Sequence, residues 1–159
     1  MAEQTTLEKL AIRDADGAVV EEASLSNGVL EGETLLYAGG RVHARLPFHN
    51  GRQHGEAIYY DDAGRVSTRA NYQAGKLHGR SSYFDTAGRL VRKSSYRNGE
   101  LHGQTIDYYP SGEPREVTHY QNNLLDGELI RLEEDGKIKE RLYYRQGKQR
   151  RAPVHPKAI

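Results

Sequence analysis

The sequence predicts an all-β protein, an elongated antiparallel meander of about five 24-residue β-hairpin repeats that form a twisted single-layer sheet. Three observations predict this fold. Glycines recur at a constant spacing, two short β-prone runs lie between turn sequences in each period, and aromatic residues recur at fixed places in those runs. The 159 residues include 17 Gly and 11 Tyr, which suits a thin sheet of half-exposed rings better than a thick core.

The period is read from three sets of glycines along the chain. In each set the step is 23 residues once and 24 residues thereafter. Three sets that hold one period of this length indicate a repeat architecture, in which each unit stacks on its neighbours. The glycines to which we assign a structural role in the repeat are Gly51, Gly55, Gly64, Gly75, Gly79, Gly88, Gly99 and Gly103.

Each period contains one hairpin and leads into the next. In the clearest unit, residues 56–60 form a first β-prone run that ends at the turn sequence of residues 61–64. A second run, residues 65–72, ends at the turn sequence of residues 73–76. Glycine supplies the positive φ that both turns need, so consecutive strands are expected to pair in sequence order.

Two columns of mainly aromatic residues follow the same period. Side chains at alternate positions of a strand share one face, so each column is expected to form a ladder along the sheet. The column in the first run includes Tyr60, Phe84 and Tyr108. The column that closes the second run has a structural role, and it includes Tyr72, Tyr96, Tyr120 and Tyr144.

The pattern changes at two places in the later repeats. Asn123 replaces the turn glycine, and because asparagine tolerates the left-handed conformation we expect that turn to survive. Pro114 interrupts an apolar column, and proline donates no hydrogen bond to a central strand. We therefore expect a bulge or an irregular strand over residues 112–115.

The domain organisation follows from the repeat and from the charge of the ends. Residues 17–148 form the repeat array, residues 1–16 an N-terminal cap and residues 149–159 a basic C-terminal tail. The first 33 residues are rich in acidic side chains, whereas the tail has no acid and contains Pro153 and Pro156. Both ends are expected to hinder edge-to-edge pairing of sheets.

Composition and charge exclude several classes of protein. With 23 basic and 22 acidic side chains the net charge is +1, which gives no general attraction to nucleic acid and only weak attraction to anionic membranes. The chain has no cysteine, and its opening residues lack the apolar stretch of a secretory signal. We expect a cytoplasmic protein, or a periplasmic one if a signal peptide has been removed.

Neither a metal site nor a catalytic site is expected. His54, His78 and His102 share a column, but members of a column lie about 10 Å apart, too far to ligate one zinc ion. Acidic pairs such as Asp61-Asp62 lie in predicted turns, where such residues are common. We expect no cofactor and no enzymatic activity.

The repeated units resemble a known family of repeats. Segments such as Ala74-Gly75-Lys76-Leu77-His78-Gly79 and Asn98-Gly99-Glu100-Leu101-His102-Gly103, each followed by an aromatic residue and a further glycine, resemble MORN-variant repeats over about residues 17–148. Bacterial proteins of this kind include a YwqK-like antitoxin group and immunity proteins encoded beside secreted toxins. The resemblance implies a non-catalytic protein that binds and neutralises a cognate toxin or effector.

The partner-binding surface has two candidate positions. One is the face opposite the main apolar columns, with Arg69, Asn71 and Lys93, and the other is the ladder of Tyr60, Phe84 and Tyr108 if it lines a concave side. Alternatives to toxin binding are a membrane-associated or oligomeric scaffold, and self-association through the edges of the sheet.

Overall fold

The computed structural model describes residues 7–152, in which all regular structure is β-strand. Fifteen strands form one antiparallel sheet, as the repeat predicts. Within this range no helix is long and apolar enough to cross a membrane. The strands are β1 (Glu8–Arg13), β2 (Val19–Ser26), β3 (Val29–Leu30), β4 (Gly32–Ala38), β5 (Arg41–His49), β6 (Arg52–Gln53), β7 (Gly55–Tyr60), β8 (Val66–Gln73), β9 (Lys76–Phe84), β10 (Leu90–Arg97), β11 (Glu100–Tyr108), β12 (Pro114–Gln121), β13 (Leu124–Leu132), β14 (Ile138–Arg145) and β15 (Lys148–Arg150).

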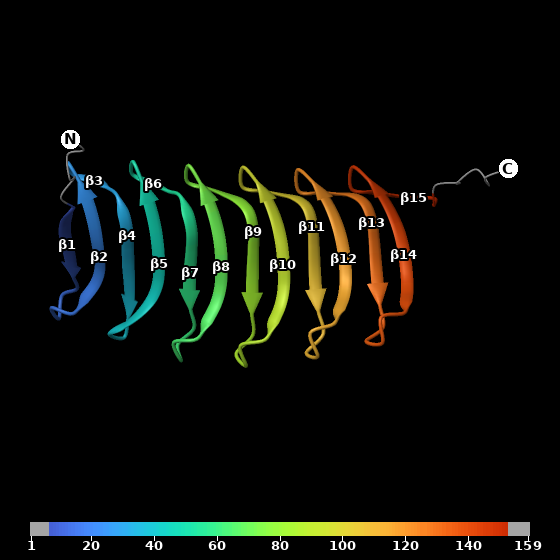
Figure 1. Ribbon diagram of the computed structural model, residues 1–159, viewed down its shortest axis with the longest axis horizontal. Helices are drawn as coiled ribbons and strands as arrows, with labels where there is room; N and C mark the ends of the chain where they lie inside the picture. The colour runs from blue at the N-terminus through green and yellow to red at the C-terminus, as the bar shows by residue number, and fades with distance from the viewer. Residues whose placement is uncertain (1–6, 153–159) are drawn as a thin grey trace, which may run out of the picture.

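The strands pair in sequence order, so the molecule is a long, narrow array (Figure 1). The short strands β3 and β6 pair with β2 and β5, and they are the first halves of repeat strands that continue as β4 and β7. Within the segment expected as an N-terminal cap, β1 pairs with β2 and opens the sheet. The parts of the cap and tail in residues 1–6 and 153–159, with Pro153 and Pro156, lie outside the described residues.

The upper turns in Figure 1 join one repeat to the next. Each has two residues with positive φ, as in the two-residue turns that match the twist of β-hairpins. The expected turn at Asn122-Asn123 is confirmed, with φ angles of 51° and 65°. The second turn residue also links neighbouring repeats, because the amide of Gly75 donates to the carbonyl of Gln53 and that of Gly99 to Leu77.

The lower turns close each hairpin and use an aspartate in several repeats. The Asp61 carboxylate accepts hydrogen bonds from the amides of Ala63 and Arg65 and from the Arg65 guanidinium. Asp85 makes the same contacts with Ala87 and Arg89. The acidic residues of these turns therefore order the backbone, as aspartate does in many turns.

An irregularity beside Pro114 is confirmed, and it belongs to the repeat as a whole. The pairing of β11 with β12 shifts between Asp107 and Tyr108, where Tyr108 faces Pro114. The same shift occurs between Tyr59 and Tyr60 in an earlier hairpin that has no proline. Proline is tolerated here because it is the first residue of β12, next to a bulge that already interrupts the ladder.

A ladder of mostly small, buried side chains crosses the longer strands of the sheet near their middle. Its members in β7 to β14 are paired in register, and they are Ala57, Ala70, Ser81, Ser94, Thr105, Thr118, Leu129 and Leu142. From Ala57 to Leu129 their exposure is 6% or less. We call this set the central ladder.

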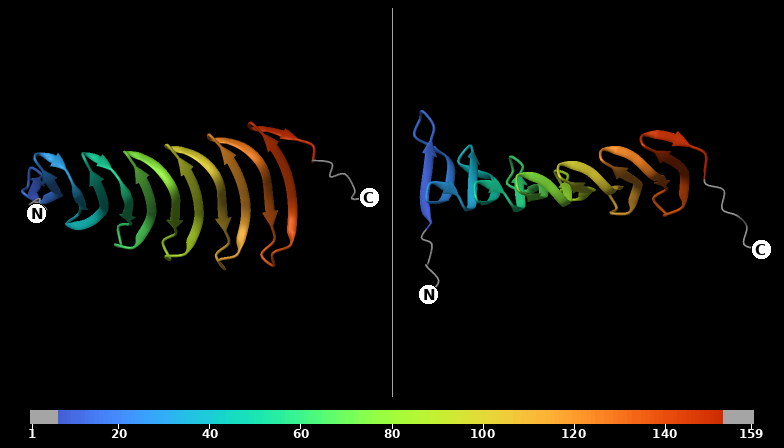
Figure 2. Two further views of the ribbon diagram at one scale, coloured as in Figure 1. Left: turned by 45° about the horizontal axis from the view of Figure 1, so that its top comes forward. Right: turned by 90° about the horizontal axis from the view of Figure 1, so that it is seen from above.

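The sheet curves toward the central ladder, so that this face is concave. Tyr59 faces Thr68 on the neighbouring strand, and Tyr72 lies four residues beyond Thr68. On a flat sheet Tyr59 and Tyr72 would therefore be offset by about 13 Å along the strands. Their hydroxyl oxygens are nevertheless 3.3 Å apart. Figure 2 shows strands that bow in the same sense along the array.

The two predicted aromatic columns lie on opposite faces of the sheet. The column that closes the second run lies on the concave side, where each tyrosine faces a glycine of the preceding strand. Its members are Tyr72, Tyr96, Tyr120 and Tyr144. Tyr60 follows the concave-face residue Tyr59 directly, so its side chain lies on the convex side. Phe84 and Tyr108 hold the same place in their hairpins.

Candidate functional site

Pairs of tyrosines cover the central ladder in the middle of the array. The hydroxyl groups of Tyr59 and Tyr72 meet above Ala57, which is 0% exposed. In the next hairpin the hydroxyl oxygens of Tyr83 and Tyr96 are 3.0 Å apart, and Ser81 below them is 1% exposed. Burial and then the hydrogen bond with Tyr96 raise the pKa of Tyr83 to about 12. These pairs close the concave face in two successive hairpins.

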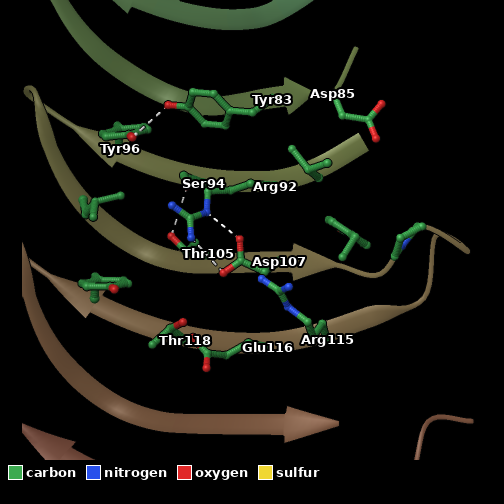
Figure 3. A pocket seen from close by; sticks show the side chains of 15 residues that line it. Tyr83, Asp85, Arg92, Ser94, Tyr96, Thr105, Asp107, Arg115, Glu116 and Thr118 are labelled. Atoms are coloured by element: carbon green, nitrogen blue, oxygen red, sulfur yellow. Dashed lines mark hydrogen bonds and ion pairs between the residues drawn. The ribbon is translucent and has the colours of Figure 1, made fainter. Parts of the chain in front are cut away.

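The next hairpin breaks this pattern at one position. Asp107 stands where Tyr59 and Tyr83 stand in their hairpins, 24 residues apart at each step. An aspartate is too short to meet the tyrosine across the ladder, and within residues 7–152 no hydrogen bond is formed by the Tyr120 hydroxyl. A pocket of about 640 Å³ opens here over β10, β11 and β12 (Figure 3).

The pocket is built around an ion pair between Arg92 and Asp107. The guanidinium donates to both carboxylate oxygens, with distances of 2.6 Å from Nε and 2.9 Å from Nη2. The Asp107 side chain is 11% exposed and that of Arg92 is 51% exposed. The hydrogen bond to Asp107 raises the pKa of Arg92. The pair therefore holds a planar cation with one side open to the pocket.

The remaining charges near the pocket leave one cation without a counter-ion. Asp85 pairs with Arg89, and Glu116 shares Arg131 with Glu140. Arg115 is exposed and forms no ion pair with any other residue of the range 7–152. Figure 3 shows it extending from β12 on the side of the pocket where Asp107 lies. Arg115 and the exposed side of Arg92 thus offer hydrogen-bond donors to an acidic group of a ligand.

The walls and floor of the pocket supply ring faces and hydroxyl groups. Tyr96 and Tyr120 line it, and the floor consists of Ser94, Thr105 and Thr118 from the central ladder. The Thr105 hydroxyl donates to the Ser94 hydroxyl at 3.3 Å. Tyrosine rings and arginines anchor many protein–protein interfaces, because they combine apolar area with polar groups. This arrangement is suited to binding.

Sequence reasoning selected other residues for partner binding, and the structure places them on the convex face. Arg69 forms an ion pair with Glu56, and the Asn71 amide donates to the carbonyl of Arg80. Lys93 lies above the ring of Tyr108, with Nζ 5.9 Å from the ring centroid.

Tyr60 and Phe84 directly follow the concave-face residues Tyr59 and Tyr83 and lie on the convex side, whereas Tyr108, beside Lys93, is also among the residues that line the pocket. Two aromatic residues are adjacent in the strand at positions 59 and 60, and alternation from Ala57 of the central ladder places Tyr59, not Tyr60, on the concave face. Sequence reasoning also missed Arg92, Asp107 and Arg115. The signal that identifies Asp107 is its place in a column that holds tyrosine at 59 and 83.

The histidine column lies along the upper turns and continues into acidic residues. Glu31 precedes His54, His78 and His102 in this column, and Asp126 follows them. Glu31 accepts a hydrogen bond from the amide of Asn50, and this bond, together with His49, lowers the pKa of Glu31. Asp126 accepts from the amide of Gln146. Across residues 7–152 no group of three His, Cys, Asp or Glu is arranged to hold a metal ion.

Comparison with known proteins agrees with the repeat architecture. Residues 101–122 match the family described as MORN repeat variant. Repeats of this family are in general protein- or membrane-binding modules and are not enzymes. None of the curated proteins matches the chain. A solved structure described as a GtfA/B complex bound to UDP and GlcNAc is similar to 69% of this chain at 18% identity and a TM-score of 0.28, and the similar region spans 22% of that chain.

Proposed function

We propose that the protein is a non-catalytic binding module whose concave face receives a segment of a cognate protein, and that this partner is a bacterial toxin or secreted effector. In this role it is an immunity protein, or antitoxin, that neutralises the partner in the cytoplasm. The observation that carries the proposal is the pocket at Asp107, where the tyrosine cover of the central ladder is interrupted.

The shape and chemistry of the pocket support a protein segment as its ligand. It crosses three adjacent strands, so an extended chain can lie across it. Tyr96 and Tyr120 offer ring faces, while Arg115 and the exposed side of Arg92 offer hydrogen-bond donors. We therefore expect an acidic side chain of the partner to enter the pocket between the rings.

The resemblance of the repeats to those of immunity proteins supports a toxin as the partner. A rigid array that covers the active site or substrate entry of an enzyme blocks it without chemistry of its own. The array is stiff along its length because each turn is bonded to the preceding repeat. Little reorganisation is then needed on binding, which favours affinity.

The test is co-purification of the protein with the product of a neighbouring reading frame that encodes a toxin-like enzyme, followed by calorimetry. Arg115→Glu is expected to weaken binding by at least about tenfold with an unchanged melting temperature, because the side chain is exposed. Arg69→Glu on the convex face is the control, and its affinity is expected to stay at the wild-type value.

The opposite result, a loss with Arg69→Glu and none with Arg115→Glu, would move the interface to the convex face. If the pair forms no complex and co-expression does not restore growth, the immunity role is rejected. Sedimentation with anionic vesicles tests the membrane alternative, since robust salt-sensitive binding without a protein partner would favour a scaffold.

A further inference from the structure

The two ends of the array are complementary parts of one repeat strand. At one end, β15 pairs with β14 through Tyr144↔Gln149 and Arg145↔Lys148. The same register joins β12 to the first part of β13, through Tyr120↔Leu125 and Gln121↔Leu124. Residues 148–150 therefore correspond to residues 124–126, and β15 is only the first part of a repeat strand.

At the other end, β1 is the second part of such a strand. Leu10 faces Ala23 and Arg13 faces Val19 across a register shift. The corresponding pairs in a complete hairpin are Leu129↔Leu142 and Leu132↔Ile138, also across a shift. Residues 8–13 therefore correspond to residues 127–132, the part that β15 lacks.

Both ends have open edges within the described residues. Over residues 7–152 no strand pairs with the outer side of β1, and β15 covers only residues 143–145 of β14. In Figure 1, β15 lies at the top of β14 and leaves the lower part of that strand without a neighbour among the described residues. The unpaired stretch of β14, residues 138–142, corresponds to residues 114–118 of β12, and in the interior of the array residues 116–118 pair with residues 129–131 of β13.

Exposed apolar side chains gather at these edges. In the interior of the array the central ladder is buried, but Leu10, which continues it in β1, is 45% exposed. Ile12 beside it is 44% exposed, and Ile138 at the start of β14 is 52% exposed. These residues would become covered if another strand continued the sheet at each end.

The ends also carry opposite charge. Residues 8–26, which contain β1 and β2, have five acidic and two basic side chains. Residues 137–151, which contain β14 and β15, have seven basic and one acidic. The charge of one end therefore attracts the other end of a second molecule and repels its own kind.

We infer that copies of this chain join head to tail, with β1 of one copy added to the open edge of β14 of the next, so that β15 and β1 together complete one repeat strand. The pairing follows the register of β12 with β13. Leu10 of the copy that contributes β1 then lies beside Leu142 of the other copy and continues the central ladder across the joint. Because the two contacting surfaces differ, the assembly has no closed twofold symmetry and extends by further copies.

Two variants block one end each. Leu10→Lys combined with Ile12→Lys makes β1 basic, and both side chains are exposed in the single chain. Ile138→Lys adds a cation to the open edge of β14, at a residue that is 52% exposed in the single chain, and it also faces a basic β1 unfavourably in the mixture of the two variants. Leu124→Lys, at a residue that is 49% exposed away from the outer edges of β1 and β14, is the matched control.

The measurement is sedimentation velocity over a concentration series at low and high salt. The wild type and Leu124→Lys are expected to grow in mass with concentration at low salt, and less so at high salt, because the Debye length falls. Each end-blocked variant alone is expected to stay monomeric. An equimolar mixture of the two is expected to form dimers and nothing larger, since one intact joint remains.

Hydrogen exchange supplies a second readout on the wild type. Amides of residues 10–13 and 138–142 are expected to gain protection as concentration rises. A wild type that remains monomeric at all concentrations at low salt, or a mixture of blocked variants that stays monomeric, would overturn the inference. Association of the blocked variants by themselves would also overturn it, since the contact would then lie elsewhere.

Discussion

At the scale of single residues, position 107 separates a covered from an open stretch of the concave face. Tyrosine at 59 and 83 reaches across the central ladder to a second tyrosine, and the pair excludes solvent from the small residues below. Aspartate at 107 instead accepts both hydrogen bonds of Arg92, and Tyr120 is left without its counterpart. One change in a repeated column thus replaces a packing contact by a polar pocket.

The double variant Arg92→Thr with Asp107→Tyr is expected to close the pocket. It copies Thr68 and Tyr83, which are paired at the equivalent place, so the new tyrosine can meet Tyr120. The free energy of unfolding is expected to change by about 1 kcal/mol or less, because a partly buried ion pair and its desolvation are exchanged for a hydroxyl pair. Binding of the partner is expected to be lost, which calorimetry measures. Retained affinity would show that the partner does not use the pocket.

The Tyr83 hydroxyl predicts a pH dependence at the alkaline end. Its pKa in the folded protein is about 12, raised from 10.0 mainly by burial. Because this pKa is higher in the folded than in the unfolded protein, the protonated Tyr83 hydroxyl adds to the free energy of unfolding. This addition is fully present below pH 10 and is lost as the pH rises toward 12. Denaturant titrations over this range are expected to show a smaller alkaline loss for Tyr83→Phe than for the wild type. An identical pH profile for both proteins would contradict the assignment.

At the scale of elements, each hairpin is held by its turns as well as by its ladder. The upper turns need two residues with positive φ, and asparagine fills the first place at 27, 50, 98 and 122. Ala74 fills that place with a φ of 50°, a conformation that alanine adopts less readily than asparagine. The turn at 74–75, like the one at 146–147 where Gln146 has a φ of 50°, is therefore more strained than the turns that begin with asparagine.

Exchanging the residues at two equivalent turns tests this strain. Ala74→Asn is expected to raise the free energy of unfolding by about 1 kcal/mol, because asparagine tolerates the left-handed region. Asn98→Ala is the matched control, with an expected loss of similar size. Urea titration measures both, and the slope of the free energy of unfolding against urea concentration should stay constant. Changes of the same sign in the two variants would be inconsistent with a backbone origin.

At the scale of the whole molecule, stability is distributed along the array. Each strand contacts its two neighbours, and no layer covers the sheet among the described residues, so the free energy is close to a sum of neighbour terms. The pocket spans β10 to β12, and the inferred joint between copies involves β1, β14 and β15. Binding and assembly therefore use separate parts of the array.

Deletion of residues 52–75 removes one period and joins Gly51 to Lys76 in the original turn register. The shortened chain is expected to fold, with a lower free energy of unfolding. The slope of this free energy against urea concentration is expected to be smaller by roughly one fifth, because about one fifth of the hairpins is lost. Binding at the pocket is expected to persist. A chain that unfolds without passing through a cooperative transition would contradict the additive description.

Much of the fold can be predicted from the sequence because its signals are local. The turn residues, the alternating runs and the period all follow from short stretches of chain, and the structure confirms the meander that they predict. The turn at Asn122-Asn123 and the irregularity beside Pro114 are confirmed for the same reason. The candidate site was predicted less well, because of Tyr60, Phe84 and Tyr108 only Tyr108 is among the residues that line the pocket, and Asp107 was not selected.

The sequence alone determined that consecutive strands pair in order and which residues repeat, since period and turn chemistry are properties of the chain itself. Only the tertiary structure decided which face is concave and which aromatic column covers it. That choice depends on which residues of each strand form the buried central ladder, and on contacts between strands such as the one that joins Tyr83 to Tyr96. A pocket arises where such a contact is missing, and the loss of a contact between strands is not a local property of either strand.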